Sequence, residues 1–351
     1  MILRNSFTLD HIKKLQAEYG RDPILLEKAI FAFGLLESLA ITGLDFVFKG
    51  GTCLLLLLQN PRRLSTDIDL VTKPGTDIDE YINRAAEIFP FIRCEEQHRQ
   101  AVRNIEKRHF KIMYDSPMYR KEHSIILDVV FEDNYYPTTV TGMISNALLE
   151  TEEPYTDIKI PTLNCILGDK LTAFAPKTIG IALGINRDMD VMKQHHDVAV
   201  LIDEITDFTE VKKTYKKIAE LEIGYRELDG AGINDTLKDS FNTAIAIIGR
   251  GKIFPNEYKL LMNGIRRLKD HVMDKYTPDV VESQSCRIAY LIANIMADSD
   301  DLEKITDFDL YKDVLITNLS YNKLNHIKRA NLVDFAYLYE AIKLVEQGRV
   351  G

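Results

Sequence analysis

The residues best suited to chemistry in this chain are two aspartates and a pair of glycines. Asp67 and Asp69 lie two positions apart in a run whose alternate residues, Ile68 and Leu70, are apolar, which predicts a β-strand. Residues i and i+2 of a strand point to the same side, so both carboxylates share one face. Two negative charges this close repel, and a divalent cation that takes oxygen ligands from both, and from the phosphates of a nucleotide, relieves the repulsion.

A glycine turn precedes this strand. Residues 47–51 predict a buried strand that ends in Gly50 and Gly51, and residues 52–59 predict the following helix, which ends before Pro61. The N-terminus of a helix favours phosphate, because its first N–H groups have no partner within the helix and its dipole is positive there. Each feature alone is more typical of a tight turn or a solvated strand edge. Together they predict a metal-dependent nucleotide site.

At these residues the chain resembles the nucleotidyltransferase superfamily built on the DNA polymerase β catalytic module. The run Lys49-Gly50-Gly51-Thr52, followed by Arg63-x-Ser65-x-Asp67-x-Asp69, more closely resembles the AbiEii/AbiGii toxin family, the nucleotidyltransferases of type IV toxin–antitoxin and phage-abortive systems. The resemblance implies that Asp67 and Asp69 bind catalytic Mg²⁺. It implies nucleotide binding by Lys49, Gly50, Gly51, Thr52, Ser65 and Lys170.

Asp128 lies in a later segment that also follows the family pattern. Residues 109–114 and 124–131 both predict strands, separated by a polar turn that contains Pro117. Aliphatic residues enclose Asp128, so an aspartate without a function would need a buried partner or a raised pKa. The family's third acid lies on such a strand, which implies that Asp128 completes the metal-binding set near the attacking hydroxyl. The alternative is a paired structural aspartate.

Two further segments resemble later family motifs. Residues 161–174 resemble a helix in which Lys170 would face the triphosphate, and the alternative is an ordinary surface lysine. Residues 193–201 resemble the family's Lys/Arg-Asp-x-x-Asp-Leu segment, with Asp197 at the last acidic position. The sequence departs from the pattern here, since other acids at 188 and 190 offer a competing alignment.

The histidine and cysteine spacing does not predict a zinc site. His195 and His196 are adjacent, so on a helix they do not face one another, and we expect them to be solvated. The four cysteines have no paired spacing, which indicates neither a disulfide framework nor a metal knuckle. They are Cys53, Cys94, Cys165 and Cys286.

Length and periodicity predict two domains of an α+β protein. A chain of 351 residues is long for one core. Strand and helix signals alternate over residues 1–190, which predicts a small mixed-sheet nucleotidyltransferase core of the polymerase β type, flanked by helices. Amphipathic helical spacing dominates residues 191–351, which predicts a largely helical C-terminal domain. The longest apolar stretch, 54–58, is too short to span a bilayer, and we expect a cytoplasmic enzyme.

The formal net charge of −9 gives no global attraction to a polyanion. Two local basic stretches exist, and each is more typical of a solvated helix face than of a binding surface. One is Lys212, Lys213, Lys216 and Lys217, and the other is Arg250, Lys252, Lys259, Arg266, Arg267 and Lys269.

With the resemblance, these residues predict a nucleotidyltransferase that moves an NMP from an NTP to an acceptor hydroxyl with two Mg²⁺ ions. The predicted catalytic residues are Asp67, Asp69, Asp128, Lys170 and Asp197. The family's acceptors include the 3′ end of tRNA, and its toxins are restrained by a neighbouring antitoxin. A small-molecule or protein acceptor, or an inactive nucleotide- or partner-binding module, remains an alternative.

Overall fold

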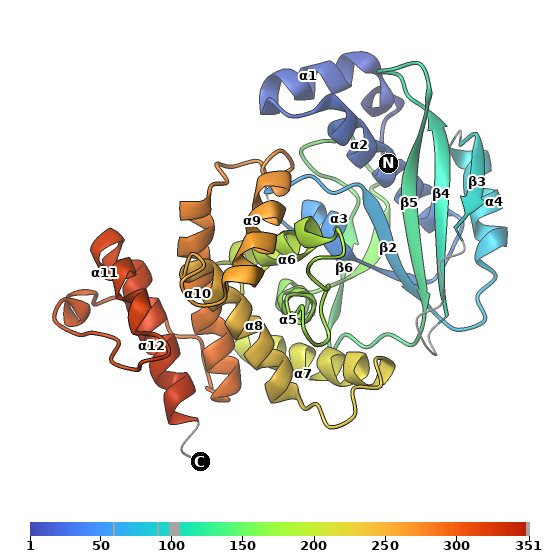
Figure 1. The fold of residues 1–351 in the computed structure, drawn as a ribbon. Helices are drawn as coiled ribbons and strands as arrows, with labels where there is room; N and C mark the ends of the chain where they lie inside the picture. The colour runs from blue at the N-terminus through green and yellow to red at the C-terminus, as the bar shows by residue number, and fades with distance from the viewer. Residues whose placement is uncertain (59, 90, 98–105, 349–351) are drawn as a thin grey trace. The chain divides into compact units, whose positions relative to one another are not determined.

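The computed structural model describes residues 1–58, 60–89, 91–97 and 106–348 (Figure 1). The chain forms two compact units. Unit 1 comprises residues 1–162 and 270–274, and unit 2 comprises residues 163–269 and 275–351. The predicted domains, 1–190 and 191–351, stay a prediction, and the compact units divide the chain after residue 162.

Unit 1 contains a mixed sheet with the strand order β3-β4-β5-β2-β1-β7-β6. The strands are β1 (Phe46–Lys49), β2 (Asp67–Thr72), β3 (Arg93–Glu96), β4 (Lys107–Asp115), β5 (Glu122–Phe131), β6 (Thr139–Met143) and β7 (Asp157–Pro161). The pairs β2–β5 and β1–β7 are parallel, and the other four are antiparallel. This confirms the predicted mixed sheet, although β6 and β7 were not predicted.

Unit 1 also contains helices, as predicted. They are a 3-10 turn, η1 (Arg4–Phe7), and helices α1 (Leu9–Tyr19), α2 (Pro23–Ile41), α3 (Gly50–Leu57) and α4 (Ile78–Ile88). Asp22 caps α2 by accepting from the Ile24 N–H at 2.8 Å, and Pro23 takes the first helical position. Asp77 caps α4 in the same way.

One face of the sheet is buried and the other presents polar side chains. Helix α2 packs on the buried face, where Tyr114 of β4 donates to the buried carboxylate of Glu27 at 2.9 Å. The alternate residues Ile68 of β2 and Leu127 of β5 are fully buried, and each such side chain stabilises the fold by roughly 1.5–3 kcal/mol. Because the side-chain period of a strand is two, the polar residues between them share the opposite face.

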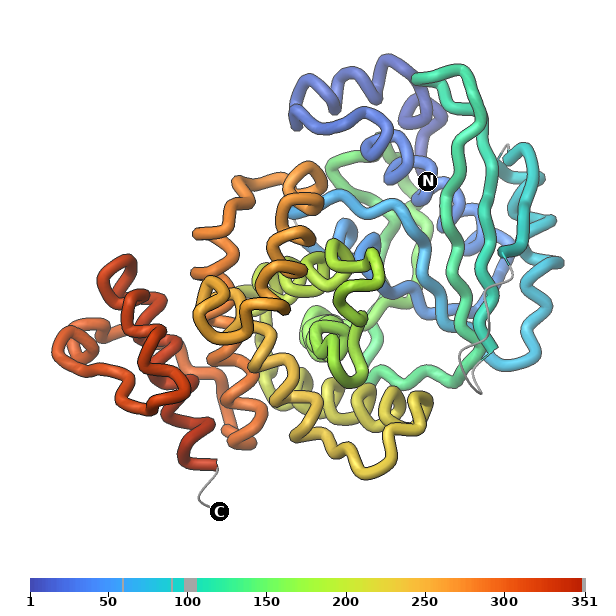
Figure 2. The backbone as a smooth tube through the Cα atoms, in the orientation of Figure 1, coloured from blue at the N-terminus to red at the C-terminus, as the bar shows by residue number. Residues whose placement is uncertain are grey.

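Unit 2 is helical, as predicted, and Figure 2 follows its chain from α5 to α12. Its main helices are α5 (Leu163–Ala173), α6 (Asp188–Leu201), α7 (Phe208–Tyr225), α8 (Ile233–Ile248), α9 (Pro255–Leu268), α10 (Pro278–Met296) and α12 (Leu332–Gln347). Shorter turns are η2 (Asp309–Tyr311), η3 (Asn322–Asn325) and α11 (His326–Ala330). Helix α5 packs on α6 and α7, α6 on α9, and α10 on α8 and α12.

Helix α9 ends at Leu268. The following residues belong to unit 1, where the N–H of Leu64 donates to the carbonyl of His271 at 2.9 Å and Val272 pairs with Arg63. Backbone groups engaged in this pairing cannot continue the helix.

Two further observations concern the whole of the described chain. None of its helices combines the length and apolar character needed to cross a membrane. All four cysteines are free thiols, three of them buried.

Candidate active site

A row of polar residues crosses four strands on the polar face of unit 1. Asp69 of β2 lies opposite Asp128 of β5 on one side and opposite Lys49 of β1 on the other. Neighbouring strands are about 4.8 Å apart, so the register brings the two carboxylates together. Asp67 lies two residues along β2 on the same face. The three predicted acids therefore gather on one patch of the sheet.

The turn from β1 into α3 fits closely against this patch. Gly50 has φ +83°, a left-handed conformation that glycine adopts readily, and a Cβ at this position would collide with the carboxylate of Asp69. A Cβ on Gly51 would collide with the Arg63 guanidinium and the Ser65 hydroxyl. The backbone at the start of α3 therefore approaches both the acids and a buried arginine, and only glycine permits this approach.

The other predicted nucleotide-binding residues lie around this turn. The hydroxyl of Thr52 is buried and donates to the backbone carbonyl of Asp67 at 2.5 Å, which ties α3 to β2. Ser65 is half-buried beside Gly51. The ammonium of Lys49 donates to the Tyr135 hydroxyl at 2.6 Å and lies 5.4 Å from the centre of that ring.

The structure adds a residue to which the sequence analysis gave no role. His109 of β4 lies opposite Asp128, and its Nδ1 is 2.6 Å from Asp128 Oδ1. An ionised carboxylate only accepts hydrogen bonds, which assigns the proton to Nδ1. The sequence contains one signal for this pair: each residue is a polar side chain within a predicted strand of mostly apolar residues.

The donor chemistry of the patch fits a magnesium ion. Mg²⁺ prefers oxygen ligands and is usually held by one or two carboxylates together with substrate phosphates and water. Asp67, Asp69 and Asp128 supply such oxygens on one face. Within the described residues, no three histidine, cysteine or acidic side chains form a ready-made metal cage.

Unit 2 brings together two residues that the sequence analysis predicted separately. Lys170 of α5 and Asp197 of α6 form an ion pair of 3.1 Å, and their side chains are only 9% and 1% exposed. The phenol of Tyr276 is also buried and has no hydrogen-bond partner among the described residues. Burial, and then the negative charge of Asp197, raise the pKa of this phenol. Lys170 is thus not the surface lysine of the alternative prediction.

A family model described as nucleotidyl transferase AbiEii toxin, type IV TA system, matches residues 35–275, which is more than half of the chain. The chain belongs to this family. It is accordingly a nucleotidyltransferase, and the resemblance drawn from Lys49 to Asp69 is confirmed.

Three solved structures are distantly similar to this AbiEii-family chain. JHP933 from Helicobacter pylori is 14% identical, with a TM-score of 0.36 over 69% of this chain and 97% of its own. A putative nucleotidyltransferase from H. pylori is 15% identical, with a TM-score of 0.35 over 68% and 95%. An antigenic nucleotidyltransferase-like protein from Paracoccidioides brasiliensis is 16% identical, with a TM-score of 0.35 over 65% and 94%. These values are too low to carry an assignment. A search of curated proteins finds no significant match.

Asp188 and Asp190, which competed with Asp197 in the sequence alignment, have structural partners in the AbiEii-family chain. Asp188 accepts from the Gly184 N–H at 2.8 Å and from the Asn263 amide at 3.1 Å. Asp190 forms an ion pair of 3.1 Å with Lys193. Asp197 has such a partner too, in Lys170, so its place at the family position stays a prediction.

The prediction that His195 and His196 are solvated was wrong. His195 is fully buried and His196 is 3% exposed, because both face inward from α6. Nε2 of His195 lies 2.8 Å from Ser285 Oγ, which itself donates to the Val281 carbonyl, so the imidazole donates to the serine. Burial, and to a lesser degree the charge of His196, lower the pKa of His195 to about 3.

The four lysines of α7 do not form a single basic surface. Lys212 is buried and lies 3.1 Å from the carboxylate of Asp298, and Lys216 lies 3.0 Å from the same carboxylate. These two lysines lower the pKa of Asp298. Lys213 and Lys217 remain exposed.

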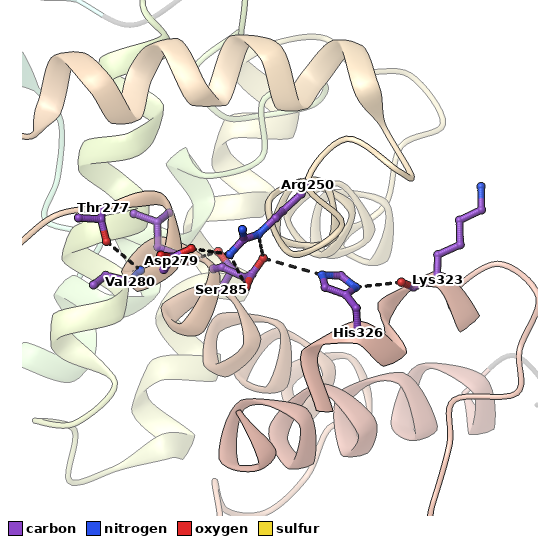
Figure 3. Close-up of polar contacts among 9 residues, drawn as sticks. Arg250, Thr277, Asp279, Val280, Ser285, Lys323 and His326 are labelled. Carbon is purple, nitrogen blue, oxygen red and sulfur yellow. Dashed lines mark hydrogen bonds and ion pairs between the residues drawn. The ribbon is translucent and has the colours of Figure 1, made fainter. Parts of the chain in front are cut away.

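In the second basic stretch, Arg250 is paired with acidic side chains, as Figure 3 shows. Arg250 forms ion pairs with Glu282 and, at 2.6 Å, with Asp279 of α10. His326 lies 4.0 Å from the same Glu282 carboxylate, and its Nδ1 is 2.9 Å from the Lys323 carbonyl. This network connects the end of α8 to α10 and α11, which is a structural role.

Proposed function

We propose that this nucleotidyltransferase transfers an NMP from an NTP to the 3′ hydroxyl of an RNA, with tRNA as the preferred acceptor, and that it acts as a toxin. The observation that carries the proposal is the register of Asp69 with Asp128, directly beside the glycine turn that begins α3, in a chain of the AbiEii family.

In this proposal Asp67 and Asp69 hold Mg²⁺ together with the triphosphate. The N–H groups of Gly50, Gly51 and Thr52 at the start of α3 bind phosphate oxygens, as helix N-termini do. Asp128 orients the acceptor hydroxyl, and His109 fixes the orientation of Asp128. When bound, Mg²⁺ supplies charge neutralisation on the phosphates and lowers the pKa of the hydroxyl. Two ions of this kind are expected during turnover.

The roles of Lys170 and Asp197 stay predictions that rest on the family pattern. Their mutual ion pair supports a shared role, since a buried lysine and a buried aspartate are each costly without the other. A cognate antitoxin as partner rests on the family description alone.

The test is transfer of label from each α-labelled NTP to purified tRNA, total RNA, protein or small metabolites, with Mg²⁺ present. We expect label in tRNA, and we expect Asp67→Asn or Asp69→Asn to reduce transfer by about 100-fold or more. Thermal stability of both variants should be unchanged or higher, because each variant removes one of two repelling charges.

Label in protein or in a metabolite, with none in RNA, would overturn the RNA acceptor. A variant that keeps its activity but loses several degrees of Tm would return the aspartate to a structural role.

A further inference from the structure

A groove of about 920 Å³ runs along α2 in unit 1. Helix α2 lines it with Phe31, Gly34, Ser38 and Ile41, which are three or four residues apart and therefore share one face of the helix. These positions span ten residues, or about 15 Å of helix. Because α2 packs on the buried face of the sheet, the groove is separate from the acidic patch on the polar face.

Three aromatic rings form the floor of the groove. The ring of Phe7 lies 5.3 Å from that of Phe31 and 4.6 Å from that of Phe89, edge to face in both cases. A Cβ on Gly34 would stand 2.9 Å from the Phe7 ring and 3.1 Å from the Phe89 ring. The absence of a side chain at Gly34 thus lets these rings pack directly on α2. The floor is apolar and already ordered, so a ligand that covers it loses little conformational entropy in the protein.

The walls of the groove carry apolar side chains that contact water. Ile41 of α2 is 46% exposed, and Ile88 at the end of α4 is 45% exposed. Single exposed apolar residues are normal on a protein surface, whereas apolar residues that gather around one groove indicate an interaction site. An apolar stripe about 15 Å long matches one face of a helix of roughly three turns, whose side chains recur at i, i+3 or i+4, and i+7.

The rim of the groove is acidic. Glu87, Asp115 and Glu152 line it and are exposed, and their carboxylates form no ion pair with another residue in the described part of the chain. Arg4 is the one basic side chain among the described lining residues. This rim, in a chain of net charge −9, attracts a basic segment and repels an acidic one, including a second copy of this chain.

We propose that this groove binds an amphipathic helix of a protein partner, with aliphatic side chains on the aromatic floor and Lys or Arg side chains at the rim. The proposal goes beyond nucleotide transfer, because it assigns a docking surface on the other side of the sheet from the acidic patch. Burial of the apolar stripe supplies affinity, and the rim carboxylates select a basic helix over an acidic one.

The experiment uses two fluorescein-labelled amphipathic peptides of about 18 residues as probes. Both have leucine on the apolar face, and their polar faces carry either lysine or glutamate. Binding to the full chain is followed by anisotropy. The groove variant is Ile41→Ser with Ile88→Ser. The matched variant is Leu310→Ser with Leu315→Ser, which removes two exposed leucines of unit 2.

A third variant, Glu87→Gln with Glu152→Gln, tests the rim without changing an apolar residue. It should bind the lysine peptide more weakly than the parent at low salt and with a flatter salt dependence, because two of the attracting charges are gone. Thermal melting and gel filtration are measured for every protein.

We expect the lysine peptide to bind the parent at least about 10-fold more tightly than the glutamate peptide. The groove variant should lose about 10-fold or more in affinity for the lysine peptide, while the leucine variant stays within about twofold of the parent. Equal affinities of these two variants, or equal binding of the two peptides, would overturn the proposal.

Two further outcomes also decide against it. If the parent self-associates and the groove variant does not, the groove binds a second copy of the chain and not a basic helix. If the groove variant melts at a lower temperature, the rim variant decides the question, since it changes only exposed carboxylates. Unchanged affinity and salt dependence in the rim variant would then overturn the proposal.

Discussion

The carboxylate of Asp128 lies between another carboxylate and an imidazole. Asp69 is its register neighbour on β2, and His109 on β4 holds its Oδ1 at 2.6 Å. The first neighbour repels it, and a bound cation would relieve this repulsion. The second constrains the orientation of the carboxylate, which leaves the other oxygen available to a ligand.

This geometry predicts opposite outcomes for two amide substitutions of His109. Asparagine places its amide nitrogen near the position of Nδ1, whereas glutamine reaches toward that of Nε2. We expect His109→Asn to retain transfer within about threefold. His109→Gln should lower kcat by about 10-fold or more, since a hydrogen bond to a charged group contributes roughly 1.5–3 kcal/mol.

The measurement combines steady-state kinetics with Mn²⁺ affinity by calorimetry in the presence of an NTP analogue. The glutamine variant should lose metal affinity as well as kcat, with a smaller change in the KM of the NTP. Equal values for the two variants would show that His109 does not position Asp128.

Among the elements, the junction of β1 and α3 is tightly packed. Gly50 and Gly43 have the same φ of +83°, but a Cβ at Gly43 would meet no atom within 4 Å, while one at Gly50 would collide with Asp69. Gly43→Ala should therefore lower the free energy of unfolding by about 1–2 kcal/mol, which is the cost of holding alanine in the left-handed conformation. Gly50→Ala should cost more and also abolish binding of the Mg²⁺–NTP analogue complex.

Urea unfolding and calorimetric nucleotide binding of the two alanine variants check this prediction. Normal nucleotide affinity in Gly50→Ala would mean that the close approach of the turn to Asp69 is not needed for binding.

Helices α5 and α6 are joined by the buried pair Lys170–Asp197. Removing one partner of a buried ion pair leaves an uncompensated charge, which typically costs about 3–5 kcal/mol. We expect Lys170→Met to destabilise the protein by this amount, and Lys170→Met with Asp197→Leu to recover much of it.

The free energy of unfolding in urea, measured for both single variants and the double variant, checks this coupling. If a Lys170 variant is inactive but as stable as the parent, Lys170 acts in nucleotide transfer and not in stability. Loss of activity in an unstable variant says nothing about contact with the substrate.

The stability of the whole molecule should depend on pH through the buried His195. Its pKa is about 3 in the folded protein and about 6.5 when unfolded. The unfolded chain therefore binds the proton first as the pH falls. The stabilisation is fully present above about pH 6.5 and is lost progressively below it, by about 2 kcal/mol at about pH 5.

His195→Gln keeps a donor for Ser285 and removes this titration. We expect the difference in the free energy of unfolding between about pH 7.5 and pH 5 to be about 2 kcal/mol smaller in the variant than in the parent. The same pH dependence in both proteins would show that His195 does not cause it.

The sequence by itself determined most elements and the positions of the acids. Its periodicities predicted the β2 strand and the helical character of unit 2, because hydrophobic period is a local property. Alternation alone placed Asp67 and Asp69 on one face. The family resemblance from the same residues was confirmed by the match over 35–275.

Only the tertiary structure decided which residues meet. Strand pairing is non-local, so no local pattern could put His109 beside Asp128. Likewise, burial of His195 and pairing of Lys170 with Asp197 depend on which helix faces pack together. A polar residue in a sequence can be exposed to water or buried beside a partner. Only the fold shows which of the two holds, because it places the neighbouring residues.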